Sequence, residues 1–177
     1  MRWLNEPKVW QRTSDGLNVR SDPRTDFWRE THSGAVRDNG HFYGAAVAGN
    51  FTASVRITAA YNATYDQSGM MLRQGPEAWM KCGTERIDGR IFLSAVVTEG
   101  SSDFSLAEVT SPPTSLWLRI QRQGRTVEAF ASWDGTAFHL FRQFQFAQER
   151  PTDIGVMLAA PLGEGFDASF AELSLAS

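Results

Sequence analysis

The chain has 177 residues, of which 42% are hydrophobic and 12% aromatic, and its formal net charge is -3. This length and composition suit one globular domain with a sizeable core, and they exclude a disordered or fibrous chain. The slightly acidic balance, with no run of clustered Lys or Arg, argues against nucleic acid as a partner. We therefore expect a single domain over residues 1–177.

The first residues, up to Thr13, contain no apolar stretch long enough for a signal peptide. No later window approaches the roughly 18 apolar residues that a membrane span needs. The single cysteine, Cys82, excludes an internal disulfide and fits a reducing compartment. These features predict a soluble, cytoplasmic protein with no membrane partner.

Most of the chain alternates apolar and polar residues with a period of two, which is typical of strands half-buried in a sheet. Turn-forming pairs such as Asn39-Gly40, Asp88-Gly89 and Pro112-Pro113 separate the alternating segments. No window of about 11 residues shows helical periodicity. In chain order, we predict strands at residues 17–20, 42–47, 51–59, 69–73, 78–85, 90–97, 104–109, 115–121, 126–132, 137–143, 154–160 and 166–175.

One hairpin is predicted with particular clarity. The strands at 126–132 and 137–143 are separated by Trp133-Asp134-Gly135-Thr136. Asp-Gly offers the positive backbone dihedral angles that a tight turn requires. Many short strands joined in this way predict an all-β fold with two packed antiparallel sheets, a β-sandwich of the jelly-roll type.

The segment from Ala78 to Glu85 places charged residues at strand spacing within an apolar run. Side chains alternate across a sheet, so Trp79, Lys81 and Glu85 should share one face. Unpartnered charges are costly to bury. This face is therefore either a satisfied ion-pair network or a wet concave site that meets a ligand, and the sequence leaves both alternatives open. Cys82 falls on the opposite face, where we expect a small core residue.

An ordered set of motifs spans almost the whole chain and resembles the DUF1349 family, also called regulation-of-enolase-protein-1-like, in the concanavalin A-like lectin/glucanase superfamily. The motifs are Trp3-x-Asn5-Glu6-Pro7, Thr25-Asp26-Phe27-Trp28-Arg29, Tyr65-Asp66-Gln67-Ser68-Gly69, Leu72-Arg73, Trp79-Met80-Lys81, Gly83-x-Glu85, Leu93-Ser94-x-Val96-Val97-Thr98, Ser102-Asp103-Phe104-Ser105 and Ser132-x-Asp134-Gly135. The resemblance implies a jelly-roll sandwich with a curved front sheet. By analogy with lectin-like relatives it favours sugar as the ligand class.

The polar and aromatic residues on these motifs and strands form the candidate ligand-binding set. Its members are Asp66, Gln67, Arg73, Trp79, Lys81, Glu85, Ser94, Thr98, Arg119 and Arg142. An indole packs on the apolar face of a pyranose while charged groups meet its hydroxyls, so this mixture suits sugar binding. The alternative is a solvated sheet face with cross-strand ion pairs. Phe27 and Trp28 are expected to be core or rim aromatics.

Catalysis is a second hypothesis. A glycosidase needs two carboxyl groups on opposite sides of the scissile bond, and Glu85 with Asp66 is the pair that we nominate. Lys81 beside Glu85 is a candidate proton-transfer pair on a sugar or sugar acid, or a structural salt bridge. The three histidines are dispersed and no phosphate loop or dinucleotide motif is present, so no metal or cofactor is expected.

The leading hypothesis is a lectin-like binding domain whose concave sheet contacts a carbohydrate. A third hypothesis takes the family name literally and expects a protein-interaction or regulatory module linked to enolase. It predicts an exposed aromatic patch that involves Trp10, Trp117 or Trp133. The sequence does not indicate an oligomeric state.

Overall fold

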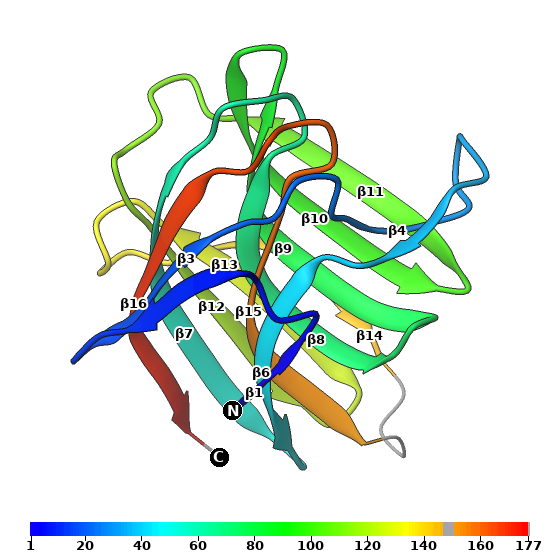
Figure 1. Ribbon diagram of the computed structural model, residues 1–177. Coiled ribbons are helices and arrows are strands. Elements are labelled where there is room, and N and C mark those ends of the chain that lie inside the picture. Colours follow the sequence, from blue (N-terminus) through cyan, green and yellow to red (C-terminus); the bar gives the residue numbers. More distant parts are fainter. Residues whose placement is uncertain (147–150, 177) are drawn as a thin grey trace.

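Two antiparallel sheets of seven strands each face one another in the computed structural model, which describes residues 1–146 and 151–176 (Figure 1). The front sheet has the order β1 (Arg2–Leu4), β6 (His41–Val47), β15 (Thr152–Ala159), β8 (Gln67–Gly75), β9 (Ala78–Ile87), β10 (Arg90–Glu99) and β11 (Ser101–Glu108). The back sheet has the order β14 (His139–Gln145), β13 (Thr126–Ser132), β12 (Leu116–Gln123), β7 (Phe51–Ala60), β16 (Asp167–Ala176), β3 (Gly16–Arg20) and β2 (Val9–Arg12). The predicted two-sheet sandwich is confirmed.

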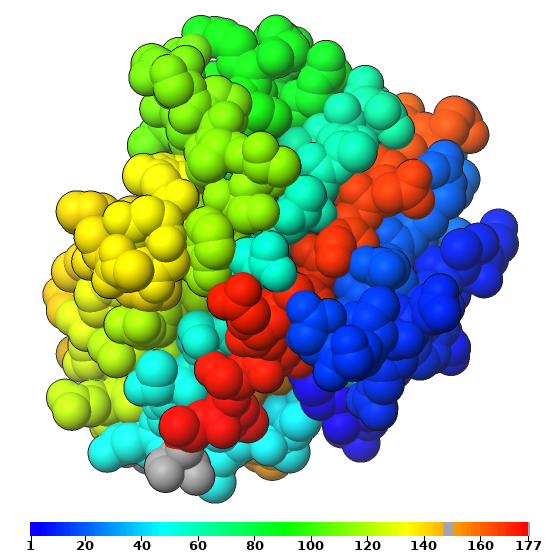
Figure 2. All heavy atoms as spheres, turned by 90° about the vertical axis from the view of Figure 1, so that its left-hand side faces the viewer, coloured from blue at the N-terminus to red at the C-terminus, as the bar shows by residue number. Residues whose placement is uncertain are grey.

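A third, two-stranded sheet consists of β4 (Phe27–Arg29) and β5 (Val36–Asp38), and we call it the ribbon. In Figure 1 the segment that carries β4 crosses in front of β10 and β11. Figure 2 is turned by 90° so that the left-hand side of Figure 1 faces the viewer, and there the colours run from yellow through green, cyan and red to blue in the order of the back-sheet strands. The ribbon packs on the front sheet, through Phe27 against Trp79 and through Asp38 against Arg73.

Each strand predicted from the alternation overlaps an observed strand, with ends that differ by a few residues. The hairpin is confirmed, because β13 and β14 pair in antiparallel register with one irregularity between Ala129 and Phe130. Four short strands, β1, β2, β4 and β5, were not predicted. Strands of three or four residues are too short for a period of two to stand out.

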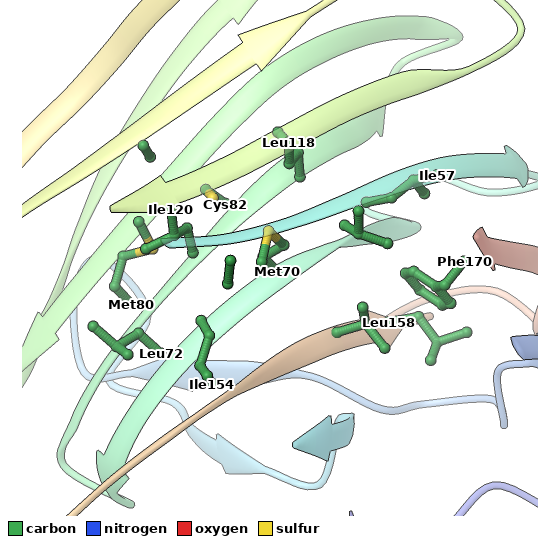
Figure 3. Close-up of a cluster of buried hydrophobic side chains, with 14 of the residues drawn as sticks. Ile57, Met70, Leu72, Met80, Cys82, Leu118, Ile120, Ile154, Leu158 and Phe170 are labelled. Carbon is green, nitrogen blue, oxygen red and sulfur yellow. The ribbon is translucent and has the colours of Figure 1, made fainter. Parts of the chain in front are cut away.

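The main core lies between the sheets and follows the alternation directly. Phe51, Val55 and Ile57 of β7 are buried while Thr52 and Ser54 between them are partly exposed. Leu118 and Ile120 of β12 meet the sulfur-containing side chains of the front sheet in the same layer (Figure 3). Cys82 is one of these residues and is 2% exposed. Burial raises the pKa of its thiol to about 12.

A second, smaller core lies on the outer face of the front sheet, beneath the ribbon. Trp79 of β9 is 1% exposed, and its ring centroid lies 6.2 Å from that of Phe27 of β4. The other buried members of this cluster belong to the front sheet and are Phe42, Met71, Val96, Met157 and Ala159. Phe27 reaches the sheet because it alternates with Trp28, which projects to the other side of the ribbon. The second core thus fixes the ribbon on the sheet.

Arg142 ties the two sheets together at one edge of the sandwich. Its Nη1 donates a hydrogen bond of 2.7 Å to Ser105 Oγ, and its Nη2 lies 3.0 Å from Asp103 Oδ1. Because Arg142 belongs to β14 and its partners belong to β11, this contact joins an edge strand of each sheet. Arg142 is therefore a structural clasp at this edge.

We expect Trp79→Ala to lower the free energy of unfolding by about 3–5 kcal/mol, because the loss of a fully buried indole leaves a cavity between the ribbon and the sheet. Urea unfolding followed by circular dichroism measures the change. Trp133→Ala is the matched control, since Trp133 is 40% exposed and should cost much less. Equal losses in the two variants would contradict this second core.

Candidate functional site

A pocket of about 600 Å³ opens on the outer face of the front sheet, next to the second core. Its floor is formed by β8, β9 and β10, which contribute Gln67, Lys81, Glu85 and Val96. The ribbon and the loops around it form the walls with Arg24, Asp26, Trp28, Thr31, His32, Ser33, Ala35 and Arg37. Tyr65, Phe104, Pro161 and Leu162 complete the rim. The pocket lies on the sheet face that the alternation within residues 78–85 predicted for Lys81 and Glu85.

Register explains why the floor residues meet. Gln67 of β8 lies directly opposite Glu85 of β9, and Lys81 lies four residues before Glu85 on the same strand. Directly opposite residues, and residues an even number apart, project to the same face of a sheet. An amide, a carboxylate and an ammonium group are thereby placed side by side at the bottom of one cavity.

The ammonium of Lys81 is directed toward the ribbon. Its Nζ donates a hydrogen bond of 2.6 Å to the backbone carbonyl of Phe27 and lies 3.4 Å from Asp26 Oδ1. The same Asp26 oxygen accepts from the backbone N–H of Phe27 at 2.8 Å and from Gln67 Nε2 at 3.4 Å. Lys81 is 5% exposed, so these contacts satisfy a buried cation and hold the start of β4 in place.

Glu85 is therefore a buried carboxyl group without an ion pair. It is 4% exposed, and among residues 1–146 and 151–176 no Lys or Arg forms a salt bridge with it. Burial is the main cause that raises the pKa of Glu85 to about 7; the negative charge of Asp26 acts in the same direction, whereas Lys81 and the Ser94 hydroxyl partly oppose the shift. Near neutral pH, Glu85 can both donate and accept a proton in the pocket.

Aromatic rings surround the opening. Tyr65 is 41% exposed and Phe104 is 38% exposed. Trp28 packs edge to face on Phe104, with ring centroids 5.8 Å apart, and its indole N–H donates a hydrogen bond of 3.0 Å to the carbonyl of Thr31. These contacts keep an apolar ring surface at the mouth above a polar floor.

Three residues that line the pocket adopt the left-handed backbone conformation that residues other than glycine rarely adopt. Arg24, His32 and Tyr65 have φ angles of 59°, 67° and 70°. Such conformations cost of order 1–3 kcal/mol each and cluster at binding sites. Hydrogen bonds hold this backbone in shape, such as the one of 2.9 Å that Asn39 Nδ2 donates to the carbonyl of Arg24.

The structure brings only part of the predicted ligand-binding set into the pocket. Gln67, Lys81 and Glu85 line it, and Ser94 contacts Glu85. Trp79 shares their face but has no open surface, because Phe27 covers it. The expectation of an exposed indole platform at this position is corrected by the second core.

Arg73 and Thr98 also lie on the front sheet but have structural partners. Arg73 forms a bidentate ion pair with Asp38 of β5, with distances of 2.9 and 2.8 Å. The hydroxyl of Thr98 lies 2.9 Å from that of Ser102, which accepts a hydrogen bond from the backbone N–H of Arg29. Both residues thus support the ribbon from the sheet and do not line the pocket.

Asp66 and Glu85 do not face a common cavity. Asp66 is fully buried, and its Oδ2 accepts hydrogen bonds of 2.8 Å from the backbone N–H groups of Asn62 and Ala63. It shapes the loop before β8 and does not line the pocket. The second carboxyl group in the pocket is that of Asp26.

Arg119 and Arg142 lie on the back sheet, so the predicted ligand-binding set does not share one sheet face. Arg119 places its guanidinium 3.7 Å from the ring centroid of Phe138, and Arg142 is the clasp described above. Alternation predicts which face of a strand is polar, but it does not say to which sheet the strand belongs.

Sequence reasoning missed most of the walls. Trp28 was expected to be a core or rim aromatic, and Asp26, Arg24, Arg37 and Tyr65 were not among the predicted ligand contacts. The signal in the sequence was the Asp26-Phe27-Trp28-Arg29 motif, in which two charged residues flank two aromatic ones. The expected roles of Phe27 in the core and Trp28 at a rim agree with their positions.

The tryptophans of the protein-interaction hypothesis do not form one patch. Trp10 lies on β2 and packs against Trp3 and Tyr43, whereas Trp117 lies on β12, with β7, β16 and β3 between the two strands. The Trp117 indole donates a hydrogen bond of 3.1 Å to Glu172 Oε2. Trp133 follows the last residue of β13 and is 40% exposed.

The part of the chain that the structure describes contains no group of three or more His, Cys, Asp or Glu side chains gathered as metal ligands. The same residues include no helix that is long and apolar enough to cross a membrane.

Comparison with known proteins gives consistent results at the family level. A family model described as a protein of unknown function, DUF1349, matches residues 3–177. The protein named "Regulation of enolase protein 1" from Saccharomyces cerevisiae is 36% identical over 173 residues, which cover 98% of this chain and 87% of that protein. A crystal structure of a functionally unknown protein from the same organism matches with a TM-score of 0.95 and 36% identity, covering 99% of this chain and 95% of the other.

More distant structures share the fold. The GH43 protein BlXynB from Bacillus licheniformis matches with a TM-score of 0.72 and 14% identity, over 96% of this chain but only 35% of its own. The carbohydrate binding module CBM66 from Bacillus subtilis matches with a TM-score of 0.59 and 14% identity, over 99% of this chain and 95% of its own. Together with the coverage of the family model, these matches show that the chain belongs to the DUF1349 family and has a two-sheet antiparallel sandwich fold.

Proposed function

We propose that the chain is a carbohydrate-binding domain that holds a sugar in the pocket beside the ribbon. The observation that carries the proposal is the combination, in one cavity of about 600 Å³, of a polar floor with an aromatic mouth. Small-molecule sites have this size and this arrangement, in which a few directed polar groups lie at the base of an otherwise apolar cleft.

The polar floor and the aromatic mouth of the pocket together suit a pyranose. An aromatic ring stacks on the apolar C–H face of the sugar, and Tyr65 and Phe104 offer partly exposed rings for this contact. Gln67 and Glu85 offer both donors and acceptors to hydroxyl groups. Fold likeness to a carbohydrate binding module supports the same ligand class by analogy.

Proton transfer on a bound sugar is a second candidate function, and the state of Glu85 favours it. Its pKa of about 7 allows the carboxyl group to act as acid or base at neutral pH. The wall carboxylate of Asp26 is already engaged by Lys81. A mechanism with one titrating carboxyl group therefore fits the pocket better than a pair of free carboxylates.

A buried Glu85 also lowers the stability of the fold at neutral pH, where its charged form is disfavoured. The pKa rises from 4.5 to about 7 on folding, so the folded chain prefers the protonated form. Protonated Glu85 therefore contributes its full share to the free energy of unfolding below the unfolded-state pKa. That contribution is lost as the pH rises through about 7. A residue that opposes folding at neutral pH is a candidate for a functional role.

Tyr65→Ala and Phe104→Ala should each weaken saccharide binding by about tenfold, because each removes a stacking surface at the mouth. A glycan array identifies a saccharide that the parent chain binds, and calorimetric titration then compares the variants. Trp133→Ala, which removes an exposed ring outside the pocket, should bind like the parent. The proposed function is wrong if the parent binds no saccharide in either assay, and the assigned mouth is wrong if the two variants bind normally.

Glu85→Gln should make the stability of the fold less dependent on pH. Between pH 5 and pH 8 the parent should lose on the order of 2–3 kcal/mol from this group, a loss that the neutral amide avoids. Urea unfolding at the two pH values measures the difference. Glu99→Gln, at an exposed position, is the control and should follow the parent. Identical pH profiles for the parent and Glu85→Gln would show that this carboxyl group is not buried in the way described.

A further inference from the structure

Two arginines at the pocket differ from most arginines of the chain, whose guanidinium groups have a partner. Arg29 pairs with Glu77 at 2.6 Å, and Arg90 pairs with Glu108 at 3.0 Å. Arg24 and Arg37 make no side-chain hydrogen bond or ion pair with any residue in 1–146 or 151–176. Both line the pocket, and both are exposed.

The ribbon explains how Arg37 reaches the pocket. Arg37 of β5 lies directly opposite Trp28 of β4, so their side chains project to the same face of the ribbon. Phe27 and Asp38, also opposite one another, project to the other face and contact the front sheet. The pairing that fixes the ribbon therefore sends the Arg37 guanidinium to the pocket side.

The charges that line the pocket do not cancel. Lys81 is paired with Asp26, which leaves Arg24 and Arg37 on the positive side and Glu85 alone on the negative side. Glu85 sits at the floor and is only partly ionised near neutral pH, because burial favours its protonated form. The mouth is thus cationic in a chain whose formal net charge is -3.

We propose that the sugar bound in this pocket is an anionic one, and that Arg24 and Arg37 hold its carboxylate or phosphate group at the mouth. This inference rests on the proposed function and specifies its ligand. A guanidinium group presents several N–H donors in a plane, which match the paired oxygens of a carboxylate or phosphate. The hydroxyls of the same sugar would face Gln67 and Glu85 on the floor.

Matched pairs of probes isolate the anionic group. We suggest calorimetric or NMR titration of the full chain with D-glucose against D-glucuronate, and with D-galactose against D-galacturonate, together with D-glucose 6-phosphate. Each acid should bind at least tenfold more tightly than its neutral partner at low ionic strength. The preference should shrink when salt is added, because exposed charges at the mouth are screened. A phosphate ester that binds more tightly than both uronates would support the same assignment and identify phosphate as the group.

The double variant Arg24→Gln/Arg37→Gln should remove the preference for the acid and leave the neutral sugar unaffected. Arg125→Gln is the matched control, since Arg125 is an exposed arginine at the turn between β12 and β13 and lies outside the pocket. Thermal unfolding of each variant checks that the fold is retained.

Two results would overturn the assignment while leaving sugar binding intact. In one, acid and neutral sugars bind equally well to the parent. In the other, the preference for the acid survives in the double variant. Absence of binding to every probe and to the glycan array would overturn the proposed function, and this inference with it.

Discussion

The buried ammonium of Lys81 determines where the ribbon lies, and the rest of the site depends on it. A cation that is 5% exposed must find oxygen partners, and the Phe27 carbonyl and the Asp26 carboxylate provide them from the start of β4. The side chain of Phe27 is then placed over Trp79, and the next residue, Trp28, turns outward. One ionic contact and one apolar cluster together seat the ribbon and leave a cavity beside it.

The same contact explains the state of Glu85. The alternation of side chains along β9 places Lys81 and Glu85 on one face, and a salt bridge between them was the simplest structural hypothesis. Because Lys81 turns to the ribbon, Glu85 remains in the cavity with the Ser94 hydroxyl and without a salt bridge to any residue of 1–146 or 151–176. A buried polar group that is satisfied only in part favours a ligand that supplies the missing partners.

The alternation of residues was sufficient to predict the sandwich, most strands and the shared face of Trp79, Lys81 and Glu85, because a period of two follows directly from pleated geometry. It could not predict what covers that face. Asp26 lies 55 residues from Lys81 in the sequence, and the ribbon strands have three residues each. Nor could it place β12 and β14, with Arg119 and Arg142, on the opposite sheet, since strand order depends on long-range pairing.

The position of Cys82 gives the chain an internal reporter of opening. Its sulfur lies in the layer between the sheets, and burial keeps the group in the unreactive thiol form. A thiol reagent can reach it only when the packing around it opens, so the rate of alkylation in native buffer reports on the opening of this layer. Since Cys82 is the sole cysteine, that rate needs no engineered label and no assignment among several sites.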